Sequence, residues 1–278
     1  MRGKLLLITA LLIAANSTLN AQIVGTDVFL QGHWLEIGEE TNGAFGANTS
    51  PAGYHPHIFG TALGEVFDYG HDGWGVGAPT YMGDYTYPGY PFEGWELQVG
   101  AVRNQAFQSG GFPGGGTLTG TVTGYSKTGG RMIGNWTGSA APGNVLKIYQ
   151  ETRVDTEASW VVVTTKMYNT SAAPIAGVYY MRSCDPDNDE TWPGGSFFTN
   201  NQVDYQNDID HRVLVEGTGQ TGVYTRIGLG TKDCRAVACV YNSWPLSGGV
   251  DLSTIWNKTY GPASYAVGVN DPGDIGIA

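Results

Sequence analysis

Residues 146–155 read Leu146-Lys147-Ile148-Tyr149-Gln150-Glu151-Thr152-Arg153-Val154-Asp155, an alternation of apolar and polar side chains. One face receives Leu146, Ile148 and Val154, and the other receives Lys147, Glu151, Arg153 and Asp155. A period of two is typical of a β-strand that packs one face on a core and exposes the other to solvent. The segment therefore predicts a long, half-buried strand.

Similar segments occur along the whole chain, and short turns separate them. They lie at Asp27–Ile37, Trp95–Val99, Thr117–Thr123, Arg131–Trp136, Trp160–Tyr168, Ile175–Arg182, Arg212–Glu216, Val223–Gly228, Arg235–Tyr241 and Ser264–Val269. No long helix-forming stretch intervenes, so successive strands are expected to pair antiparallel. The chain is predicted to be all-β, a large antiparallel β-sandwich with long loops rich in glycine and aromatic residues.

The composition agrees with this fold class. Glycine accounts for 43 of 278 residues, which is about twice the usual share. Aromatic residues reach 12%, which is too many for a disordered chain. Glycine-rich turns between aromatic and β-branched runs are typical of sandwiches and barrels. Because no stretch reads as a linker, residues 22–278 are predicted to form a single β-sandwich domain.

The N-terminus has the form of a secretory signal. Arg2 and Lys4 precede an apolar run from Leu5 to Ala15, and Leu19-Asn20-Ala21 fits a small-residue cleavage site. The apolar run is too short for a bilayer, which needs about 20 residues. We therefore expect residues 1–21 to be a cleaved signal peptide and the mature protein to be secreted or on the outer cell surface. No later segment is expected to insert into a membrane.

The other end of the sequence reads as an unfinished strand. A turn at residues 270–274 is followed by Ile275-Gly276-Ile277-Ala278, which begins a strand-like pattern. A domain that stopped there would leave a partner strand with unpaired backbone groups. The sequence therefore predicts that the last strands of the domain are missing, with a short natural edge strand as the alternative.

The chain is acidic. Its net charge of −11 becomes −13 when Arg2 and Lys4 leave with the signal peptide. Nucleic acid and anionic membrane surfaces are bound through basic patches, so neither is an expected partner. An acidic surface is compatible with Ca²⁺, with carbohydrate, or with solubility alone.

The densest group of carboxylates follows the strand-like run that ends at Arg182. Four of them lie within six residues: Asp185, Asp187, Asp189 and Glu190. An oxygen ligand at every second position of a tight loop suits Ca²⁺, although the loop is not an EF-hand. A second turn, with Asp68 and Asp72, is a further Ca²⁺ candidate. In both places a solvated acidic turn is the alternative.

Three cysteines permit one disulfide in an oxidising compartment. Cys234 and Cys239 are five residues apart, so in a regular strand they point to opposite faces. We therefore expect Cys184 to pair with one of these two, and Cys184–Cys234 is the candidate bridge. Three small buried residues are the alternative.

Catalytic motifs are absent from the sequence, which has no Gly-x-Ser-x-Gly elbow, HExxH or phosphate-binding loop. The paired carboxylates of a glycoside hydrolase need proximity in space rather than in sequence. Glu36, Glu93 and Glu96 are the first candidates for such a pair because they lie near tryptophans.

Exposed aromatic side chains would suit stacking on sugar rings. Trp34, Tyr85 and Trp95 are the candidates for this contact, and their partner would be a polysaccharide or surface glycan. Aromatic side chains are more often found in a core, which is the alternative for all three.

Four patterns give the chain a resemblance to a known family. They are Val28–Gly38, Pro51–Pro56, Gly83-Asp84-Tyr85 with Glu93-Gly94-Trp95, and Arg182–Asp189. The chain resembles the N-terminal β-sandwich region of large Bacteroidetes cell-surface adhesins of the gliding-motility type, which type IX secretion exports. The resemblance implies an exported β-sandwich followed by Ig-like or PKD-like repeats and a C-terminal sorting domain. It implies no catalytic residues.

These observations favour a non-catalytic secreted or cell-surface β-sandwich module for adhesion or glycan contact, stabilised by Ca²⁺. One alternative is a secreted carbohydrate-active enzyme, either a glycoside hydrolase or a mutarotase-like protein, or an inactive relative of one. A structural spacer domain of a surface protein is the other. The oligomeric state stays open.

Overall fold

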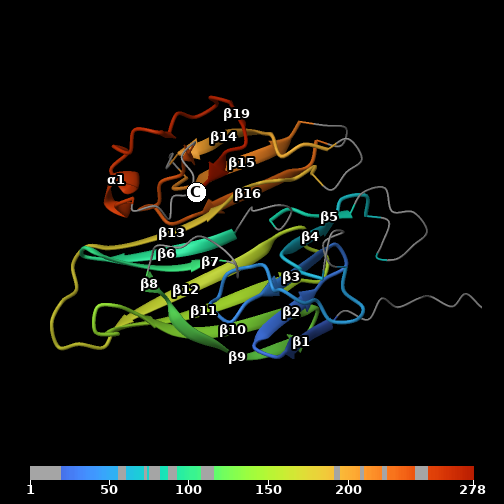
Figure 1. The fold of residues 1–278 in the computed structure, drawn as a ribbon, viewed down its shortest axis with the longest axis horizontal. Helices are drawn as coiled ribbons and strands as arrows, with labels where there is room; N and C mark the ends of the chain where they lie inside the picture. Colours follow the sequence, from blue (N-terminus) through green and yellow to red (C-terminus); the bar gives the residue numbers. More distant parts are fainter. Residues whose placement is uncertain are drawn as a thin grey trace, which may run out of the picture.

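The structure is a computed structural model that describes residues 20–55, 61–71, 74, 82–86, 93–107, 116–190, 195–206, 210–220, 224–241 and 250–278. In these ranges the regular structure is almost entirely β (Figure 1). The strands form four sheets in a propeller-like ring. The single helix among the described residues, α1 (Leu252–Trp256), begins after Asp251, whose side chain accepts a hydrogen bond from the Ser253 backbone N–H.

The first two sheets are built from strands that follow one another in the chain. The first sheet runs β1 (Asn20–Val24), β2 (Asp27–Gln31), β3 (Leu35–Glu39), β4 (Glu65–Asp68) and β5 (Met82–Asp84). The second runs β12 (Val161–Asn169), β11 (Leu146–Asp155), β10 (Arg131–Ala140) and β9 (Thr119–Thr128). All neighbours in both sheets are antiparallel.

The other two sheets combine distant parts of the chain. The third runs β18 (Ala263–Ser264), β17 (Val240–Tyr241), β20 (Gly276–Ile277), β13 (Val178–Cys184), β6 (Glu93–Val99), β7 (Val102–Phe107) and β8 (Gly116–Thr117). Only β7 and β8 pair in parallel among its described strands. The fourth runs β16 (Arg226–Thr231), β15 (Val213–Gly219), β14 (Thr199–Gln206) and β19 (Asp271–Gly273), all antiparallel.

Apolar clusters join each sheet to the next. Leu30 of the first sheet and Val154 of the second share one cluster. Ile148 of the second sheet packs in another with Trp95 of the third. Cys184 of the third sheet and Val215 of the fourth belong to one further cluster. The four sheets are therefore connected by continuous apolar packing, which supplies most of the stabilisation of a fold of this kind.

Two tryptophans fill the contact between the second and third sheets. Trp95 of β6 and Trp136 of β10 meet edge to face, with ring centroids 5.3 Å apart. The Trp136 ring covers Gly120 and Gly138, which pair across β9 and β10. A Cβ on Gly138 would lie 2.2 Å from Cη2 of Trp136, and one on Gly120 would lie 1.9 Å from Cζ2. Glycine at these two positions therefore makes room for the indole.

The all-β prediction is confirmed, and so is the strand at residues 146–155. Leu146, Ile148 and Val154 are buried, whereas Lys147 and Tyr149 are exposed. A two-layer sandwich is not confirmed, because the antiparallel sheets number four and form a ring. The sequence pattern reports which face of a strand is buried, but it does not report which sheet covers that face.

Three strand predictions differ from the structure. Asp27–Ile37 is divided between β2 and β3, which pair antiparallel. Of Ser264–Val269 only Ser264 lies in a strand, and of Arg235–Tyr241 only Val240–Tyr241 is β. A local turn explains the difference at Arg235. The Asp233 carboxylate accepts a hydrogen bond from the Arg235 backbone N–H at 2.9 Å, and the Ala236 N–H donates to the Asp233 carbonyl at 3.0 Å. An aspartate that bonds the backbone two residues on competes with strand pairing.

The structure describes the end of the predicted signal peptide and the strand predicted at the end of the sequence. Residues 1–19 of the predicted signal peptide fall outside the described residues, but Asn20 and Ala21 already belong to β1. The strand expected at Ile275–Ala278 is present as β20, and β13 and β17 flank it on both sides. No helix in the described ranges has the length and apolarity needed to span a bilayer.

Replacing Gly138 with alanine should destabilise the fold by about 1–3 kcal/mol, because the new methyl group would displace the Trp136 ring from a closely packed core. Chemical denaturation followed by Trp fluorescence measures the change. Gly124→Ala, in the neighbouring strand β9, is the matched control because no atom lies within 4 Å of its Cβ position. Equal losses for the two variants would contradict this account of the glycine.

Candidate metal centre

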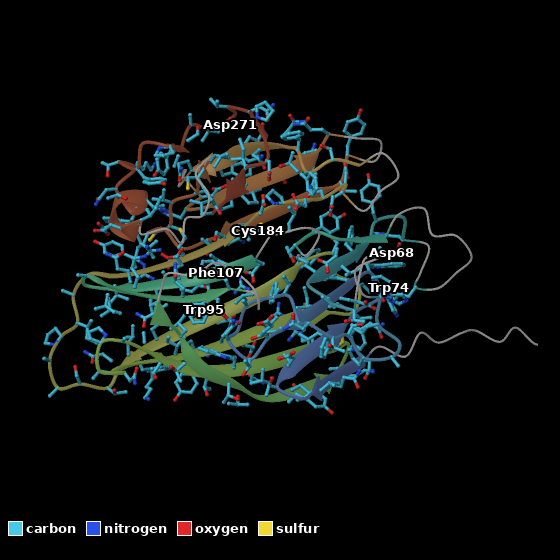
Figure 2. The ribbon with its side chains drawn as sticks, in the orientation of Figure 1. Asp68, Trp74, Trp95, Phe107, Cys184 and Asp271 are labelled. Atoms are coloured by element: carbon cyan, nitrogen blue, oxygen red, sulfur yellow. The ribbon has the colours of Figure 1, made fainter. Side chains whose placement is uncertain are left out.

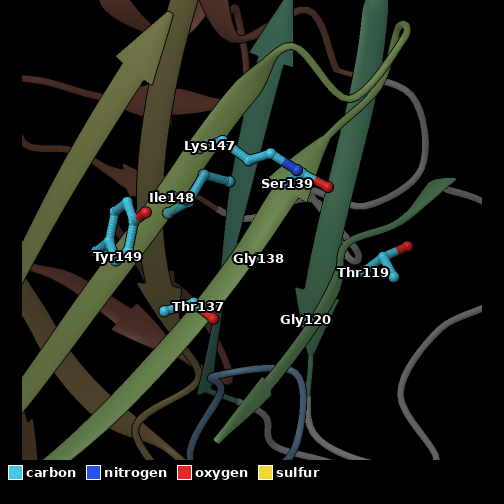
Figure 3. Close-up of a pocket in the computed structure, with 8 residues that line it drawn as sticks. All are labelled: Thr119, Gly120, Thr137, Gly138, Ser139, Lys147, Ile148 and Tyr149. Atoms are coloured by element: carbon cyan, nitrogen blue, oxygen red, sulfur yellow. The ribbon is translucent and has the colours of Figure 1, made fainter. Parts of the chain in front are cut away.

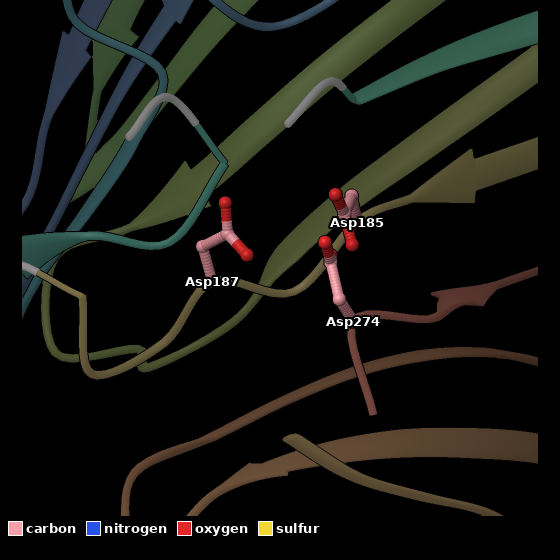
Figure 4. Close-up of side chains that lie close together, drawn as sticks. All are labelled: Asp185, Asp187 and Asp274. Atoms are coloured by element: carbon pink, nitrogen blue, oxygen red, sulfur yellow. The ribbon is translucent and has the colours of Figure 1, made fainter. Parts of the chain in front are cut away.

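Three carboxylates meet where the third and fourth sheets approach each other. Asp185 and Asp187 follow the end of β13, and Asp274 lies between β19 and β20 (Figure 4). One oxygen from each residue lies within 4.8 Å of one from each of the others. Among the described residues, this is the group of three or more His, Cys, Asp or Glu side chains that is compact enough to hold a metal ion.

Two of the three carboxylates are buried, and one oxygen of each has neither a hydrogen-bond partner nor a counter-charge among the described residues. Asp185 is 5% exposed and Asp187 is 3% exposed, and the Oδ1 atom of each lacks a hydrogen-bond partner. Burial, followed by the charge of Asp274, holds the pKa of Asp185 well above its ordinary value. Burial and the neighbouring carboxylates raise the pKa of Asp187 to about 10. None of the groups that shift these two pKa values is a cation.

The rest of the acidic loop anchors it to the fourth sheet. The Asn188 side-chain amide donates to the carbonyls of Gly217 and Thr225 at 2.7 and 2.9 Å. The Thr225 hydroxyl donates to Oδ1 of Asp189 at 2.8 Å. These bonds hold the loop in place, so the carboxylates of Asp185 and Asp187 are fixed by residues that do not belong to the centre.

The structure therefore brings some of the predicted Ca²⁺ ligands together at the centre and places others outside it. The structure brings Asp185 and Asp187 together, whereas Asp189 is hydrogen-bonded to Thr225 and lies outside the group of three. Glu190 is half-buried and close enough to raise the pKa of Asp187. Asp274, which the sequence analysis did not propose, supplies the third carboxylate. Its only signal in the sequence was an acidic turn just before the last strand.

The second predicted acidic turn forms no such centre in the described residues. Asp68 is buried at the end of β4, and its backbone N–H donates to the Trp34 carbonyl at 2.8 Å. Asp72 lies outside the described residues. Figure 2 shows Asp68 on the first sheet, well apart from Cys184 at the end of β13.

In the structure all three cysteines are free thiols, and the Cys184–Cys234 bridge stays a prediction. Cys184 and Cys239 are buried in the third sheet, whereas Cys234 is exposed. Cys234 sits in the local turn that begins at Asp233, so it does not continue the strand that would have carried it inward. Burial raises the pKa of the Cys239 thiol to about 12, which keeps it protonated and unreactive.

Two of the three aromatic residues proposed for sugar contact are buried. Trp95 is 0% exposed in the tryptophan contact described above, and Tyr85 is 3% exposed. These two side chains cannot serve as a surface platform in this structure. Trp34 is half-buried, and its ring stacks on His71 with centroids 4.5 Å apart.

The candidate catalytic carboxylates are also buried, and each has a structural partner. Oxygens of Glu36 accept hydrogen bonds from the Gln31 side chain at 2.6 Å and from the His55 backbone at 2.8 Å. Glu96 forms an ion pair with Arg103, and Glu93 forms one with Arg182. Carboxylates engaged in this way maintain the fold and do not present a pair to a substrate.

A buried polar network surrounds Arg182. Its guanidinium lies over the Phe45 ring, 4.5 Å from the centroid, and donates to the Gln150 side chain at 3.4 Å. The Gln150 amide donates in turn to Glu39 at 3.0 Å. Glu93 also accepts from the Phe45 backbone at 2.7 Å. This network links β3, β6, β11 and β13, and therefore three of the four sheets.

Two carboxyl groups in or near this network have pKa values raised above the ordinary range. Burial raises the pKa of Glu39 to about 7, against hydrogen bonds from Thr152 and Gln150 that lower it. Burial, followed by the charge of Glu93, raises the pKa of Glu65 to about 8.

Comparison with family models, curated proteins and solved structures found no match to this chain. The resemblance to cell-surface adhesins therefore stays a prediction, and the argument for function rests on the geometry of the centre.

Replacing Arg182 with methionine should destabilise the protein by about 3–5 kcal/mol, because it leaves Glu93 buried without its counter-ion. The measurement is urea unfolding at pH 7. Arg226→Met removes an ion pair to Glu216 in which Arg226 is 67% exposed, and should cost less than about 1 kcal/mol. A cost for Arg182→Met no larger than that of the control would refute a structural role for the network.

Without bound metal, the free energy of unfolding should fall as the pH rises from 5 to 8. The folded state keeps protons on Asp187, Glu65 and Glu39 that the unfolded chain, with carboxyl pKa values near 4, has already released. The loss continues toward pH 10, the folded pKa of Asp187. Urea unfolding in a chelating buffer at pH 5, 6.5 and 8 measures it, and a stability that rises over this window would contradict the burial of these groups.

Proposed function

We propose that this chain is a non-catalytic β module, secreted or displayed on the outer cell surface, that is stabilised by Ca²⁺ and acts in adhesion or glycan contact. The observation that carries the proposal is the pair of buried, unpartnered carboxylates, Asp185 and Asp187, facing a third at Asp274. Buried charges need a counter-charge, and no cation among the described residues contributes to the pKa shift of either carboxyl group.

The donor set fits a hard cation. All three side chains offer oxygen, which is the ligand that Ca²⁺ and Mg²⁺ prefer, and no cysteine or histidine belongs to the group. Ca²⁺ takes six to eight oxygens in a flexible arrangement, so the three carboxylates would leave room for backbone carbonyls, water and the nearby Glu190. Mg²⁺ demands closer to ideal octahedral geometry and keeps more of its water.

A cation here would connect three parts of the chain. Asp185 and Asp187 extend from the end of β13, whereas Asp274 joins β19 of the fourth sheet to β20 of the third. Ile275, which precedes β20, and Ile277, which belongs to it, are buried in the apolar cluster shared by these sheets. Bound Ca²⁺ would therefore hold the last strand in place and stiffen the contact between two sheets.

A binding role accords better with the described residues than a catalytic one. Glu36, Glu93 and Glu96 are buried, and each is held by a hydrogen bond or an ion pair. Membership in the exported surface adhesins belongs to the same proposal. It is supported by the signal-like N-terminus and by an acidic centre suited to the Ca²⁺ available outside cells.

Calcium should raise the stability of the chain, by about 2.7 kcal/mol at a concentration 100 times its Kd. Asp187→Asn should abolish this gain, because it removes a charged ligand from the centre. The same variant should be more stable than the wild type in chelator at pH 8, because buried Asp187 must take up a proton on folding at this pH and the asparagine need not. Thermal unfolding and hydrogen exchange of residues 271–278, each with and without Ca²⁺, measure both effects.

Asp271→Asn is the matched control for this experiment. Asp271 lies in β19, three residues from Asp274, and does not belong to the group of three. It should keep the full calcium response. A wild-type chain whose melting temperature and exchange are unchanged by millimolar Ca²⁺ would rule out the proposed centre.

A further inference from the structure

The outer face of the second sheet carries a regular patch of long side chains. In one row across the sheet, Thr137, Tyr149 and Lys166 are neighbours on β10, β11 and β12. In the next row, Ser139, Lys147 and Tyr168 are neighbours on the same strands. We call these six residues the outer patch. Its two tyrosines lie on one diagonal and its two lysines on the other.

The tyrosines of the outer patch are exposed and in contact with each other. Tyr149 is 48% exposed and Tyr168 is 52% exposed, and their rings meet edge to face with centroids 5.4 Å apart. Both side chains project from long strands, Tyr149 from the interior of β11 and Tyr168 from the second-last residue of β12, so the sheet fixes their positions. Exposed aromatic faces held by a rigid scaffold are suited to stacking on a flat partner.

A hollow of about 340 Å³ adjoins Tyr149 (Figure 3). Thr119, Thr137 and Ser139 line it with short hydroxyl side chains, and Lys147 and Tyr149 border it with longer ones. Its floor is supported from the inner face, where the Trp136 ring covers Gly120 and Gly138. The hollow therefore combines an aromatic edge with hydroxyl groups that can donate and accept hydrogen bonds.

The charge of the outer patch is opposite to that of the whole chain. The chain has a net charge of −11, but the outer patch holds two of its six lysines and no Asp or Glu. Lys147 and Lys166 are exposed, and neither forms an ion pair with a described residue. The first carboxylate further along the outer face of β11 is Glu151, in the next row. The partner that complements this surface is therefore anionic.

We propose that the outer patch binds an acidic polysaccharide, with a sugar ring stacked on Tyr149 or Tyr168 and its carboxylate or sulfate group between Lys147 and Lys166. The hydroxyls of Thr137 and Ser139 bond to the hydroxyls of the sugar. This inference rests on the proposed role in glycan contact and names its site and its ligand class. It also moves that contact from the buried Tyr85 and Trp95 to residues that solvent reaches.

The test uses calcium-loaded chain, freed of excess Ca²⁺ to prevent bridging, in affinity electrophoresis and titration calorimetry. The probes are polygalacturonate, chondroitin sulfate, neutral dextran, and vesicles of phosphatidylcholine with phosphatidylglycerol. We expect binding to at least one acidic polysaccharide, weakening with added NaCl, and no binding to dextran or vesicles.

The variants separate the outer patch from general electrostatics. Tyr149→Ala and the double variant Lys147→Gln/Lys166→Gln should each raise the Kd about tenfold or more. Two controls should bind like the wild type. Lys232→Gln/Lys258→Gln removes the same charge from exposed lysines elsewhere, and Tyr224→Ala removes a tyrosine that is 61% exposed.

Four outcomes would overturn the inference. They are no binding to either acidic polysaccharide, equal weakening by both lysine pairs, equal binding of dextran, and binding to vesicles in place of the polysaccharides. The calcium response, measured on the same samples, separates the two proposals. A normal rise in melting temperature on adding Ca²⁺, without polysaccharide binding, would contradict the inference about the outer patch but not the proposed calcium centre.

Discussion

The interior of this protein is organised by the need to compensate buried charge. Arg182 on β13 neutralises Glu93 on β6, and Gln150 on β11 connects this pair to Glu39 on β3. A charge taken out of water is tolerated only when partners replace the lost hydration. Because these partners are distributed over three sheets, the network around the ion pair helps to fix how those sheets meet, while the apolar clusters supply the bulk of the packing energy.

The need to compensate buried charge also applies to the acidic loop at residues 185–190. Near Arg182 a protein cation balances the carboxylates, but the charged groups that shift the pKa values of Asp185 and Asp187 are all carboxylates. Such a site is stable either with protons or with a metal cation on its oxygens. Near neutral pH a metal would be the stronger compensation, since it would match the charge and also coordinate the carboxylate oxygens that lack hydrogen-bond partners.

Sequence patterns predicted the local features of this fold and missed those that depend on long-range contacts. The alternation at residues 146–155 identified a strand and its buried face, and the spacing of Asp185 and Asp187 identified two members of the centre. Asp274 was not predicted as a member because only the strand pairing near the end of the sequence brings it close to Asp185 and Asp187. Trp95 was proposed as a surface residue because nothing local shows that the facing Trp136, seated over two glycines, encloses it.

The position of β20 has a consequence for the order in which the third sheet forms. This short strand lies between β13 and β17, and the Cys239 and Ala278 backbones exchange hydrogen bonds of 2.8 and 3.0 Å beside it. The third sheet therefore cannot close until residues as far as Ile277 have been added to the growing chain. Because synthesis proceeds from the N-terminus, β13 and β17 keep unpaired backbone groups until the strand between them arrives.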